Sequence, residues 1–298
     1  MPDTDNWTIG RLLNWTANYF TQNGLDSPRL DAEVLLAEAC GCQRIELYTT
    51  FDEVADEQTR VAFRELVRRR GEGMPVAYLV GRREFYAMMF HVTPDVLIPR
   101  PETEFVVVAL LDLIREQNNM NRTLYLADIG TGSGVIAICA ARHLKNARVT
   151  AVDTSAEALN VARRNADEHH VTDRIEFCQS DLLAGLSGAG PFDFIVSNPP
   201  YVTVDEFSEL SPEVREHEPR EALVAGVRGT EVIERLVDQS AGLLKTAGWL
   251  IFEISPMIAD DVCAVVESSG KWQSCEIVKD LAGHERVVKA KLGGSAFG

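Results

Sequence analysis

Hydrophobic positions follow two different spacings along the chain, one before about residue 72 and one after about residue 120. In the first part, apolar side chains recur every three or four positions, which places them on one face of an α-helix. From Thr123 onward, short apolar runs alternate with helix-spaced segments, a pattern typical of an α/β sheet covered by helices. We therefore predict a small helical bundle followed by a doubly wound α/β domain.

Capping residues divide the first part into four helices. Thr8 and Ser27 are suitable N-caps, Pro28 suits a first helical position, and Gly24 and Gly41 suit helix ends. The predicted segments, caps included, are Thr8 to Gly24, Ser27 to Gly41, Ile45 to Phe51 and Asp56 to Arg70. A bundle without evident catalytic groups suits a substrate-docking module, or merely a cap.

The composition changes at Gly71-Glu72-Gly73, and an extended linker with a β-hairpin is expected to follow. The hairpin strands are predicted at 84–86 and 89–92, and Pro101 can then open a helix. We expect three parts: a helical substrate-docking domain over 1–72, a linker with a hairpin over 73–100, and the α/β domain over 101–298.

Seven strands and four helices are predicted in the α/β domain. The strands are Leu124–Ala127, Arg148–Val152, Ile175–Cys178, Phe194–Val196, Trp249–Glu253, Ser274–Lys279 and Arg286–Lys291, and the helices are Gly134–Leu144, Ala156–Glu168, Val232–Leu244 and Ile258–Ser268. Only the short segment around Asp280-Leu281-Ala282-Gly283-His284 separates the last two strands, which is too short for a crossover. They must form an antiparallel hairpin on an otherwise parallel sheet.

Composition and charge narrow the class of protein. With 46% hydrophobic and 25% charged residues, no long apolar run and no signal-peptide pattern, the 298-residue chain is expected in the cytoplasm. The six cysteines lack metal-ligand spacing, so we expect free thiols and no metal. The net charge of −16 leaves only Arg64–Arg70 as a basic run, which favours a protein or small-molecule substrate over nucleic acid and predicts no membrane association.

A glycine-rich loop stands where the first α/β strand turns into its helix. Its sequence is Asp128-Ile129-Gly130-Thr131-Gly132-Ser133-Gly134. Glycines let the backbone approach a ligand, and a helix N-terminus offers free N–H groups. The spacing differs from that of dinucleotide binders, and the Asp128 carboxylate would repel a diphosphate. It would attract the ammonium and sulfonium groups of S-adenosylmethionine, the cofactor that we expect.

Two more acidic residues follow the next strands. Asp153 ends the second strand, where a carboxylate can accept both ribose hydroxyls. Asp181 follows the third strand and is placed for an adenine amine, with Leu182 against the ring. Either aspartate could instead be a helix or turn cap. Their recurrence at successive strand ends favours the cofactor site.

Asn198-Pro199-Pro200-Tyr201 follows a buried strand and is the strongest candidate for catalysis. Two prolines stiffen the segment and leave carbonyls without ladder partners. Free carbonyls, an asparagine amide and an aromatic ring suit a planar, hydrogen-donating substrate such as a side-chain amide or a base amine. Alone, the four residues could equally be a proline-rich turn.

With both motifs located, the chain resembles the HemK/PrmC family of release factor N5-glutamine methyltransferases over nearly its whole length. The matching segments are Ser27-Pro28-Arg29-Leu30-Asp31-Ala32, Pro75-Val76-Ala77-Tyr78-Leu79 with Gly81, Ile98-Pro99-Arg100-Pro101-Glu102-Thr103-Glu104, the glycine loop, Asn198 to Tyr201, Glu218-Pro219-Arg220 and Asp280-Leu281-Ala282-Gly283. The tetrapeptide is shared with amino-directed DNA and RNA methylases, whereas the Arg100 segment and the helical N-terminus are more specific.

Some positions depart from the family pattern. Ser255 and Ile258 stand where glycine and glutamine are usual, Leu182 replaces an aromatic residue, and Phe85-Tyr86 replaces a Phe-Trp pair. These differences concern the adenine contact and touch none of the proposed methyl-transfer groups. On the resemblance, Arg100 and Phe85 are included among the candidate cofactor-binding residues without an assigned role.

The resemblance implies methyl transfer from S-adenosylmethionine to the glutamine amide of a Gly-Gly-Gln loop in a peptide chain release factor. The Asn198 side-chain oxygen and the Pro199 carbonyl would accept both amide hydrogens, which aims the nitrogen at the methyl group. Tyr201 would pack on the amide plane, and no general base is required before transfer. The alternatives are a ribosomal-protein glutamine methylase, an amino-directed nucleic-acid methylase, and a non-catalytic cofactor-binding scaffold.

Overall fold

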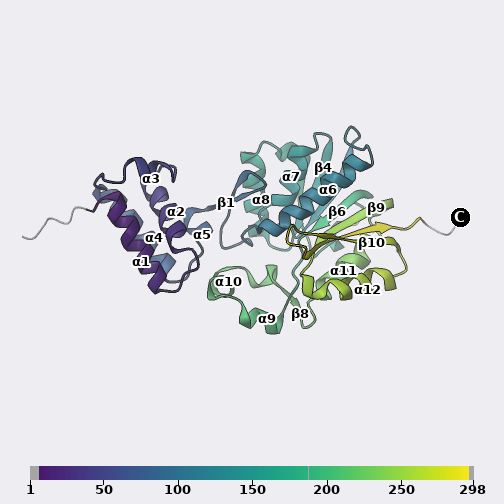
Figure 1. Ribbon diagram of the computed structural model, residues 1–298. Helices are drawn as coiled ribbons and strands as arrows, with labels where there is room; N and C mark the ends of the chain where they lie inside the picture. The colour runs from purple at the N-terminus through teal and green to yellow at the C-terminus, as the bar shows by residue number, and fades with distance from the viewer. Residues whose placement is uncertain (1–6, 187, 295–298) are drawn as a thin grey trace, which may run out of the picture. The chain divides into compact units, whose positions relative to one another are not determined.

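The computed structural model describes residues 7–186 and 188–294 and divides into two compact units (Figure 1). A helical unit contains the residues up to Gly81 together with Pro212–His217, and an α/β unit contains the rest. Residues 1–6, which contribute to the expected absence of a signal peptide, lie outside the described residues. None of the described helices combines the length and apolar character needed to span a membrane.

The helical unit contains the four predicted helices and two more. Its elements are α1 (Ile9–Gln22), α2 (Pro28–Cys40), α3 (Glu46–Thr49), α4 (Glu57–Gly71), α5 (Val76–Val80) and α10 (Pro212–His217). Thr8 caps α1 by accepting a hydrogen bond from the Arg11 amide at 3.2 Å. The short helix α5 lies where an extended linker was expected, because five residues between Pro75 and Gly81 are too few for a visible helical period.

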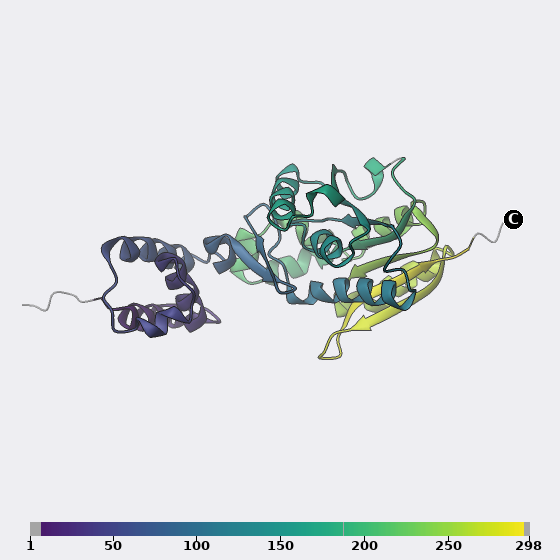
Figure 2. The same cartoon turned by 90° about the horizontal axis from the view of Figure 1, so that it is seen from above.

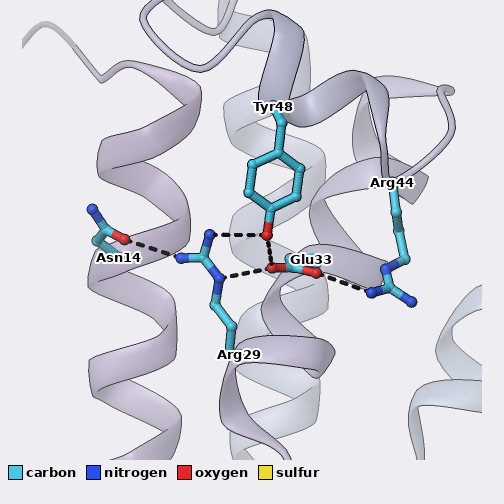
Figure 3. Close-up of polar contacts among 5 residues, drawn as sticks. All are labelled: Asn14, Arg29, Glu33, Arg44 and Tyr48. Atoms are coloured by element: carbon cyan, nitrogen blue, oxygen red, sulfur yellow. Dashed lines mark hydrogen bonds and ion pairs between the residues drawn. The ribbon is translucent and has the colours of Figure 1, made fainter.

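A buried glutamate joins three elements of the helical unit (Figure 3). The Glu33 carboxylate of α2 accepts hydrogen bonds from Arg29 at 2.7 Å, from Arg44 at 3.1 Å and from the Tyr48 hydroxyl of α3. Arg29 also donates to Asn14 of α1 at 3.0 Å. Burial alone would raise the pKa of Glu33, but the hydrogen bonds from Tyr48 and the two arginines outweigh it and lower that pKa. Glu33 is therefore held as an anion.

Helix α10 belongs to the helical unit although it lies more than 130 residues further along the chain. Arg70 of α4 is 5% exposed, and its guanidinium pairs with Asp31 of α2 and with Glu213 of α10, both at 2.8 Å. No pattern in the sequence indicates this pairing, since Arg70 stands there only as the last residue of the basic run Arg64–Arg70.

The α/β unit is built on a seven-stranded mixed sheet, as predicted. Its strands are β3 (Leu124–Ile129), β4 (Ala147–Asp153), β5 (Ile175–Gln179), β6 (Phe192–Ser197), β9 (Leu244–Glu253), β10 (Trp272–Lys279) and β11 (Glu285–Leu292), in the spatial order β10-β11-β9-β6-β3-β4-β5. β11 is antiparallel to both of its neighbours, and the hairpin that it forms with β10 lies at one edge of the sheet (yellow in Figure 2). The predicted hairpin is thus confirmed.

Helices cover both faces of this sheet (Figure 1). One core packs α6 (Glu104–Glu116), α7 (Val135–His143) and α8 (Ala156–Glu168) against it, and the other packs α11 (Glu231–Ser240) and α12 (Ala259–Ser268). The short 3₁₀ helices of the unit are η1 (Pro101–Thr103), η2 (Thr172–Arg174), η3 (Ala184–Leu186), η4 (Arg220–Ala222) and η5 (Pro256–Ile258).

Two parts of the α/β unit differ from the prediction. The helix expected over 232–244 ends at Ser240, because Leu244 already pairs with Phe192 of β6 and begins β9. Residues 202–226 contain short elements that no hydrophobic period indicated: β7 (Val202–Thr203), α9 (Val204–Glu209) and β8 (Val224–Gly226). The predicted hairpin before the sheet is present as β1 (Arg82–Phe85) and β2 (Met88–His91).

Candidate functional site

The order of the strands gathers the predicted site residues at one edge of the sheet. The chain runs from β3 to β4 and β5 on one side, then returns to place β6 on the other side of β3. Ile129, the last residue of β3, pairs with Val152 of β4 and with Ser197 of β6. The glycine loop, Asp153 and Asn198 therefore follow neighbouring strand ends at the topological switch point, where open α/β sheets bind ligands.

The glycine loop brings bare backbone to this edge. Gly130 and Gly132 have φ angles of +69° and +54°, which favour glycine. A Cβ atom on Gly132 would meet nothing within 4 Å, and one on Gly130 would lie 3.9 Å from the Asn198 carbonyl oxygen. The Gly132 amide donates to Asp153 Oδ2 at 2.8 Å. Four of the predicted positions, Gly130, Gly132, Asp153 and Asn198, thus lie close together, and Gly132 faces open space.

The remaining loop residues, Thr131, Ser133 and Gly134, hold the glycine loop in its conformation. The Thr131 and Ser133 side chains are 4% and 3% exposed, so neither offers much surface to a ligand. The Ser133 carbonyl accepts from Asn165 of α8 at 2.8 Å, and a Cβ atom on Gly134 would lie 3.1 Å from Ala162 Cβ of the same helix. These residues fix the loop against α8.

Asp128 lies beneath the loop and is fully buried. Its Oδ2 atom accepts from the Thr131 hydroxyl at 2.7 Å and from the Ala137 amide at 3.0 Å, while Oδ1 has no hydrogen-bond partner within the described residues. Burial raises the pKa of Asp128 to about 7. The Asp128 carboxylate was expected to attract a cation. Instead it holds the glycine loop by direct hydrogen bonds, and because it is buried its charge can influence a ligand only through the loop.

Asp153 and Asp181 lie in different surroundings. Half-buried Asp153 accepts from the Ser155 amide at 3.0 Å as well as from Gly132, which leaves unused lone pairs on both carboxylate oxygens. Exposed Asp181 pairs with Arg235 of α11 at 2.5 Å. Leu182 beside it has a φ angle of +49° and is partly buried against the second core. Asp153 is the better placed of the two carboxylates for ribose hydroxyls.

The tetrapeptide after β6 is tied to two residues that the sequence analysis did not single out. Asn198 Nδ2 donates to Thr103 Oγ1 of η1 at 2.9 Å, and Thr103 donates to Glu253 Oε2 of β9 at 2.6 Å. Tyr201 donates to the other Glu253 oxygen at 3.0 Å. In this orientation Asn198 Oδ1 accepts no hydrogen bond from any described residue, and neither does the carbonyl of Pro199.

Glu253 and Thr103 are almost completely buried, at 1% and 2% exposure. Burial raises the pKa of Glu253 to about 7, against the opposing effect of the two hydroxyl hydrogen bonds. Burial, with Glu253 nearby, also raises the pKa of Tyr201. The available signal in the sequence was a carboxylate closing an apolar strand, but only the adjacency of β6 and β9 connects it to Asn198.

Arg100 and Phe85, the remaining candidates, lie apart from the glycine loop contacts. Arg100 pairs with the buried carboxylate of Glu218 at 2.6 Å, and the Ile98 amide donates to the same group at 3.0 Å. Phe85 is 1% exposed and packs edge-on against Phe90 in the core. It therefore offers almost no surface to a ligand in this structure, and Arg100 has a structural partner in Glu218. Pro200 is half-buried beside buried Pro199.

The residues at this edge fit a cationic nucleoside cofactor. Asp153 provides carboxylate acceptors, the Gly132 backbone faces open space, and Asp128 adds an acidic group below. Within the described part of the chain, no group of three or more His, Cys, Asp or Glu residues is arranged to hold a metal ion. The donors present suit the sulfonium and ribose of S-adenosylmethionine better than a diphosphate.

Solved structures with a similar fold are methyltransferases. A methyltransferase from Pyrococcus furiosus matches with a TM-score of 0.50 and 18% identity, over 70% of this chain and 91% of its own. The N-terminal domain of human METTL16 in complex with SAH matches with a TM-score of 0.51 and 18% identity, over 69% of this chain and 76% of that chain. The α/β unit thus has a methyltransferase fold.

Family models and relatives identify the protein more closely. Residues 11–81 match the PrmC N-terminal domain and residues 108–211 match the methyltransferase small domain. Release factor glutamine methyltransferase from Rhodopirellula baltica is 51% identical over 97% of this chain and 98% of its own length. The Bacillus subtilis enzyme of that name is 37% identical over 96% and 98%. The chain belongs to the release factor glutamine methyltransferase family.

Proposed function

We propose that this protein transfers a methyl group from S-adenosylmethionine to the side-chain amide nitrogen (N5) of the glutamine in the Gly-Gly-Gln loop of peptide chain release factors. Family membership supports this assignment. The observation that carries it is the unsatisfied pair of acceptors, Asn198 Oδ1 and the Pro199 carbonyl, beside the glycine loop. A primary amide has two hydrogens to donate to such a pair. The reaction belongs in the cytoplasm, where release factors work.

Residues of three strand ends would hold the cofactor. Asp153 would accept from the ribose hydroxyls, the Gly130 to Gly132 backbone would lie along the ligand, and Asp128 would favour its positive charge from below. Asp181 and Leu182 would border the adenine, provided that Asp181 exchanges its contact with Arg235 for the adenine amine. When bound, S-adenosylmethionine supplies an electrophilic methyl carbon whose bond to sulfur breaks as the new bond to nitrogen forms.

The chain's own part in the reaction is orientation. An amide lone pair is delocalised, so the nitrogen is a weak nucleophile that must be aimed. Asn198 Oδ1 and the Pro199 carbonyl would fix both amide hydrogens, and the Tyr201 ring would support the amide plane. After transfer the nitrogen loses one proton to solvent, so no general base is needed to start the reaction. Pro200 would keep the segment stiff.

The helical unit would dock the release factor. It carries a pocket of about 440 Å³ between α1 and α4, lined on one side by three aromatic rings, Trp7, Trp15 and Tyr19. Trp15 is 52% exposed and stacks on Tyr19 with ring centroids 5.4 Å apart. Arg64 at the pocket has no ion-pair partner among the described residues. Exposed Trp, Tyr and Arg side chains dominate protein-binding surfaces, so a release factor segment with apolar and acidic side chains fits this pocket.

The deciding experiment is transfer of labelled methyl from S-adenosylmethionine to a purified release factor. The matched control is the same factor with the Gly-Gly-Gln glutamine replaced. We expect label on the intact factor only. Label on a ribosomal protein or on nucleic acid instead would keep the methyltransferase and overturn the substrate, and absence of transfer to all three would indicate a cofactor-binding scaffold.

A further inference from the structure

Glu253 is a buried carboxylate that the proposed reaction does not use directly. It closes β9, and β9 pairs with β6 so that Phe252 lies beside Ser197. The residues that follow these two, Glu253 at the end of β9 and Asn198 just after β6, therefore lie at the same edge of the sheet. Thr103 of η1 links them, with hydrogen bonds of 2.6 Å to Glu253 and 2.9 Å to Asn198.

The Thr103 hydroxyl has one hydrogen and must choose between its two neighbours. An ionised Glu253 only accepts, so the hydrogen points to Oε2 and a lone pair faces Asn198. Only the NH₂ end of the Asn198 amide can donate to that lone pair. Asn198 Oδ1 is consequently turned the other way, where no described residue donates to it.

We infer that Glu253, acting through Thr103, is the positioning residue that fixes which end of the Asn198 amide faces the methyl acceptor. This inference rests on the proposed function, because an outward Oδ1 selects an acceptor nitrogen that carries hydrogens. With the amide reversed, Asn198 would present NH₂ to the NH₂ of the substrate, and two donors would face each other. The orientation of the Asn198 side-chain amide is thus determined by buried Glu253 through Thr103.

Protonation of Glu253 would reverse this order. A Glu253 O–H can donate to Thr103, which frees the Thr103 hydrogen to point at Asn198 and favours the reversed amide. Burial holds the pKa of Glu253 at about 7, and the groups around it are the hydroxyls of Thr103 and Tyr201, the Glu102 carboxylate, which raises it, and the Arg286 guanidinium, which lowers it. Methyl transfer should therefore fall as the pH drops below about 7.

Thr103→Val and Thr103→Ser test the link with the smallest change of shape. Val keeps the size of Thr but removes the hydroxyl, whereas Ser keeps the hydroxyl. Thr230→Val is the matched control, because Thr230 is also buried in the α/β unit and donates to a glutamate, Glu234, at 2.8 Å. We expect Thr103→Val to lower kcat about 10- to 100-fold with S-adenosylmethionine affinity unchanged, Thr103→Ser to restore most of kcat, and Thr230→Val to leave it intact.

Glu253→Gln tests the titration. It should abolish the acidic limb of the kcat profile between pH 6 and 8, and it should add little to the loss in Thr103→Val, because both changes interrupt one chain of hydrogen bonds. Equal losses of kcat and cofactor affinity in Thr103→Val, or an unchanged acidic limb in Glu253→Gln, would overturn the inference.

Hydrogen exchange of the Asn198 side chain, measured without release factor, tests the role of Glu253 and Thr103 independently of the proposed substrate. The side-chain NH₂ signal of Asn198, identified by its disappearance in Asn198→Asp, should exchange slowly with solvent in the wild type and in Thr103→Ser, and rapidly in Thr103→Val. Equal exchange rates in all three would overturn the inference even if release factor is methylated. The expected exchange pattern without methylation would instead refute the proposed substrate.

Discussion

The two units each contain a buried glutamate with a tyrosine partner, and the two carboxylates behave in opposite ways. Glu33 in the helical unit receives two guanidinium groups in addition to Tyr48, and its pKa is lowered. Among the described residues, only the hydroxyls of Thr103 and Tyr201 donate to the Glu253 side chain in the α/β unit, and the pKa of Glu253 is raised to about 7. The two guanidinium groups and Tyr48 outweigh the desolvation of Glu33, whereas the two neutral hydroxyls do not outweigh the desolvation of Glu253.

This difference separates a structural site from a functional one. Glu33 ties α1, α2 and α3 together in one protonation state, which suits a rigid docking surface (Figure 3). Glu253 is linked to Asn198 through hydrogen bonds to Thr103, and its pKa of about 7 lies in the physiological pH range. Groups with perturbed pKa values of that kind gather at functional sites, although ion-pair networks such as that of Glu33 perturb them too.

The largest difference in kcat is expected between replacement of Asn198, which is linked to Glu253 through Thr103, and replacement of Asn14, which is linked to Glu33 through Arg29. Asn198→Ala removes the side-chain oxygen that we propose as an acceptor for the substrate amide, and we expect kcat to fall about 10²- to 10³-fold with cofactor affinity nearly unchanged. Asn14→Ala removes the contact with Arg29 and should leave kcat unchanged. Steady-state kinetics and cofactor titration measure both. Parallel losses of kcat and affinity in Asn198→Ala would refute its positioning role.

The pH dependence of stability should differ in sign between the two glutamates. Folded Glu253 binds a proton more tightly than the unfolded chain, so its contribution is present at pH 4.5 and lost as the pH rises through 7. Glu253→Gln should therefore gain stability relative to the wild type between pH 5 and 8, by up to about 3 kcal/mol. Glu33 has a lowered pKa, so its contribution is present above pH 4.5 and lost as the pH falls through that lowered value.

Thermal unfolding of Glu253→Gln, Glu33→Gln and wild type over pH 3–8 checks this prediction. The deficit of Glu33→Gln should be largest near neutral pH and shrink in acid. If the stability difference from wild type changed with pH in the same way for both mutants, the proposed distinction between Glu33 and Glu253 would be wrong.

Removing the exposed ring of the pocket should affect docking alone. Trp15→Ala should raise KM for release factor about 10- to 30-fold and leave kcat unchanged, since exposed tryptophans are frequent anchors of protein interfaces. Tyr125→Ala is the control, because Tyr125 is 48% exposed in the α/β unit and does not line the pocket. An unchanged KM in Trp15→Ala would show that release factor does not dock at this pocket.

The smallest contrast compares the two tyrosines. Tyr201→Phe removes a hydrogen bond that lowers the pKa of Glu253, so the acidic limb should move to higher pH and kcat at pH 7 should fall about three- to tenfold. Tyr48→Phe should leave kcat unchanged and cost about 1 kcal/mol of unfolding free energy. An acidic limb that stays in place in Tyr201→Phe would argue that Glu253 does not cause it.

The sequence by itself determined most features that depend on local spacing, although the short elements α5, β7, α9 and β8 were missed. The strands of the seven-stranded sheet, the cap at Thr8, the glycine loop after β3 and the tetrapeptide after β6 were predicted because side-chain period and backbone freedom are properties of neighbouring residues. Ser27 precedes α2 as predicted, but its side chain makes no capping hydrogen bond. The C-terminal hairpin followed from a loop too short to cross the sheet.

The tertiary structure alone decided which distant residues meet. Glu253 lies at the same sheet edge as Asn198 only because β9 pairs with β6. Thr103 of η1 reaches Glu253 over 150 positions, and Arg70 reaches Glu213 over 143 positions. The orientation of the Asn198 amide depends on that pairing, since a hydroxyl's single hydrogen has a direction only once its acceptor is in place. Strand order and the packing of helices set these contacts, and no hydrophobic period encodes either of them.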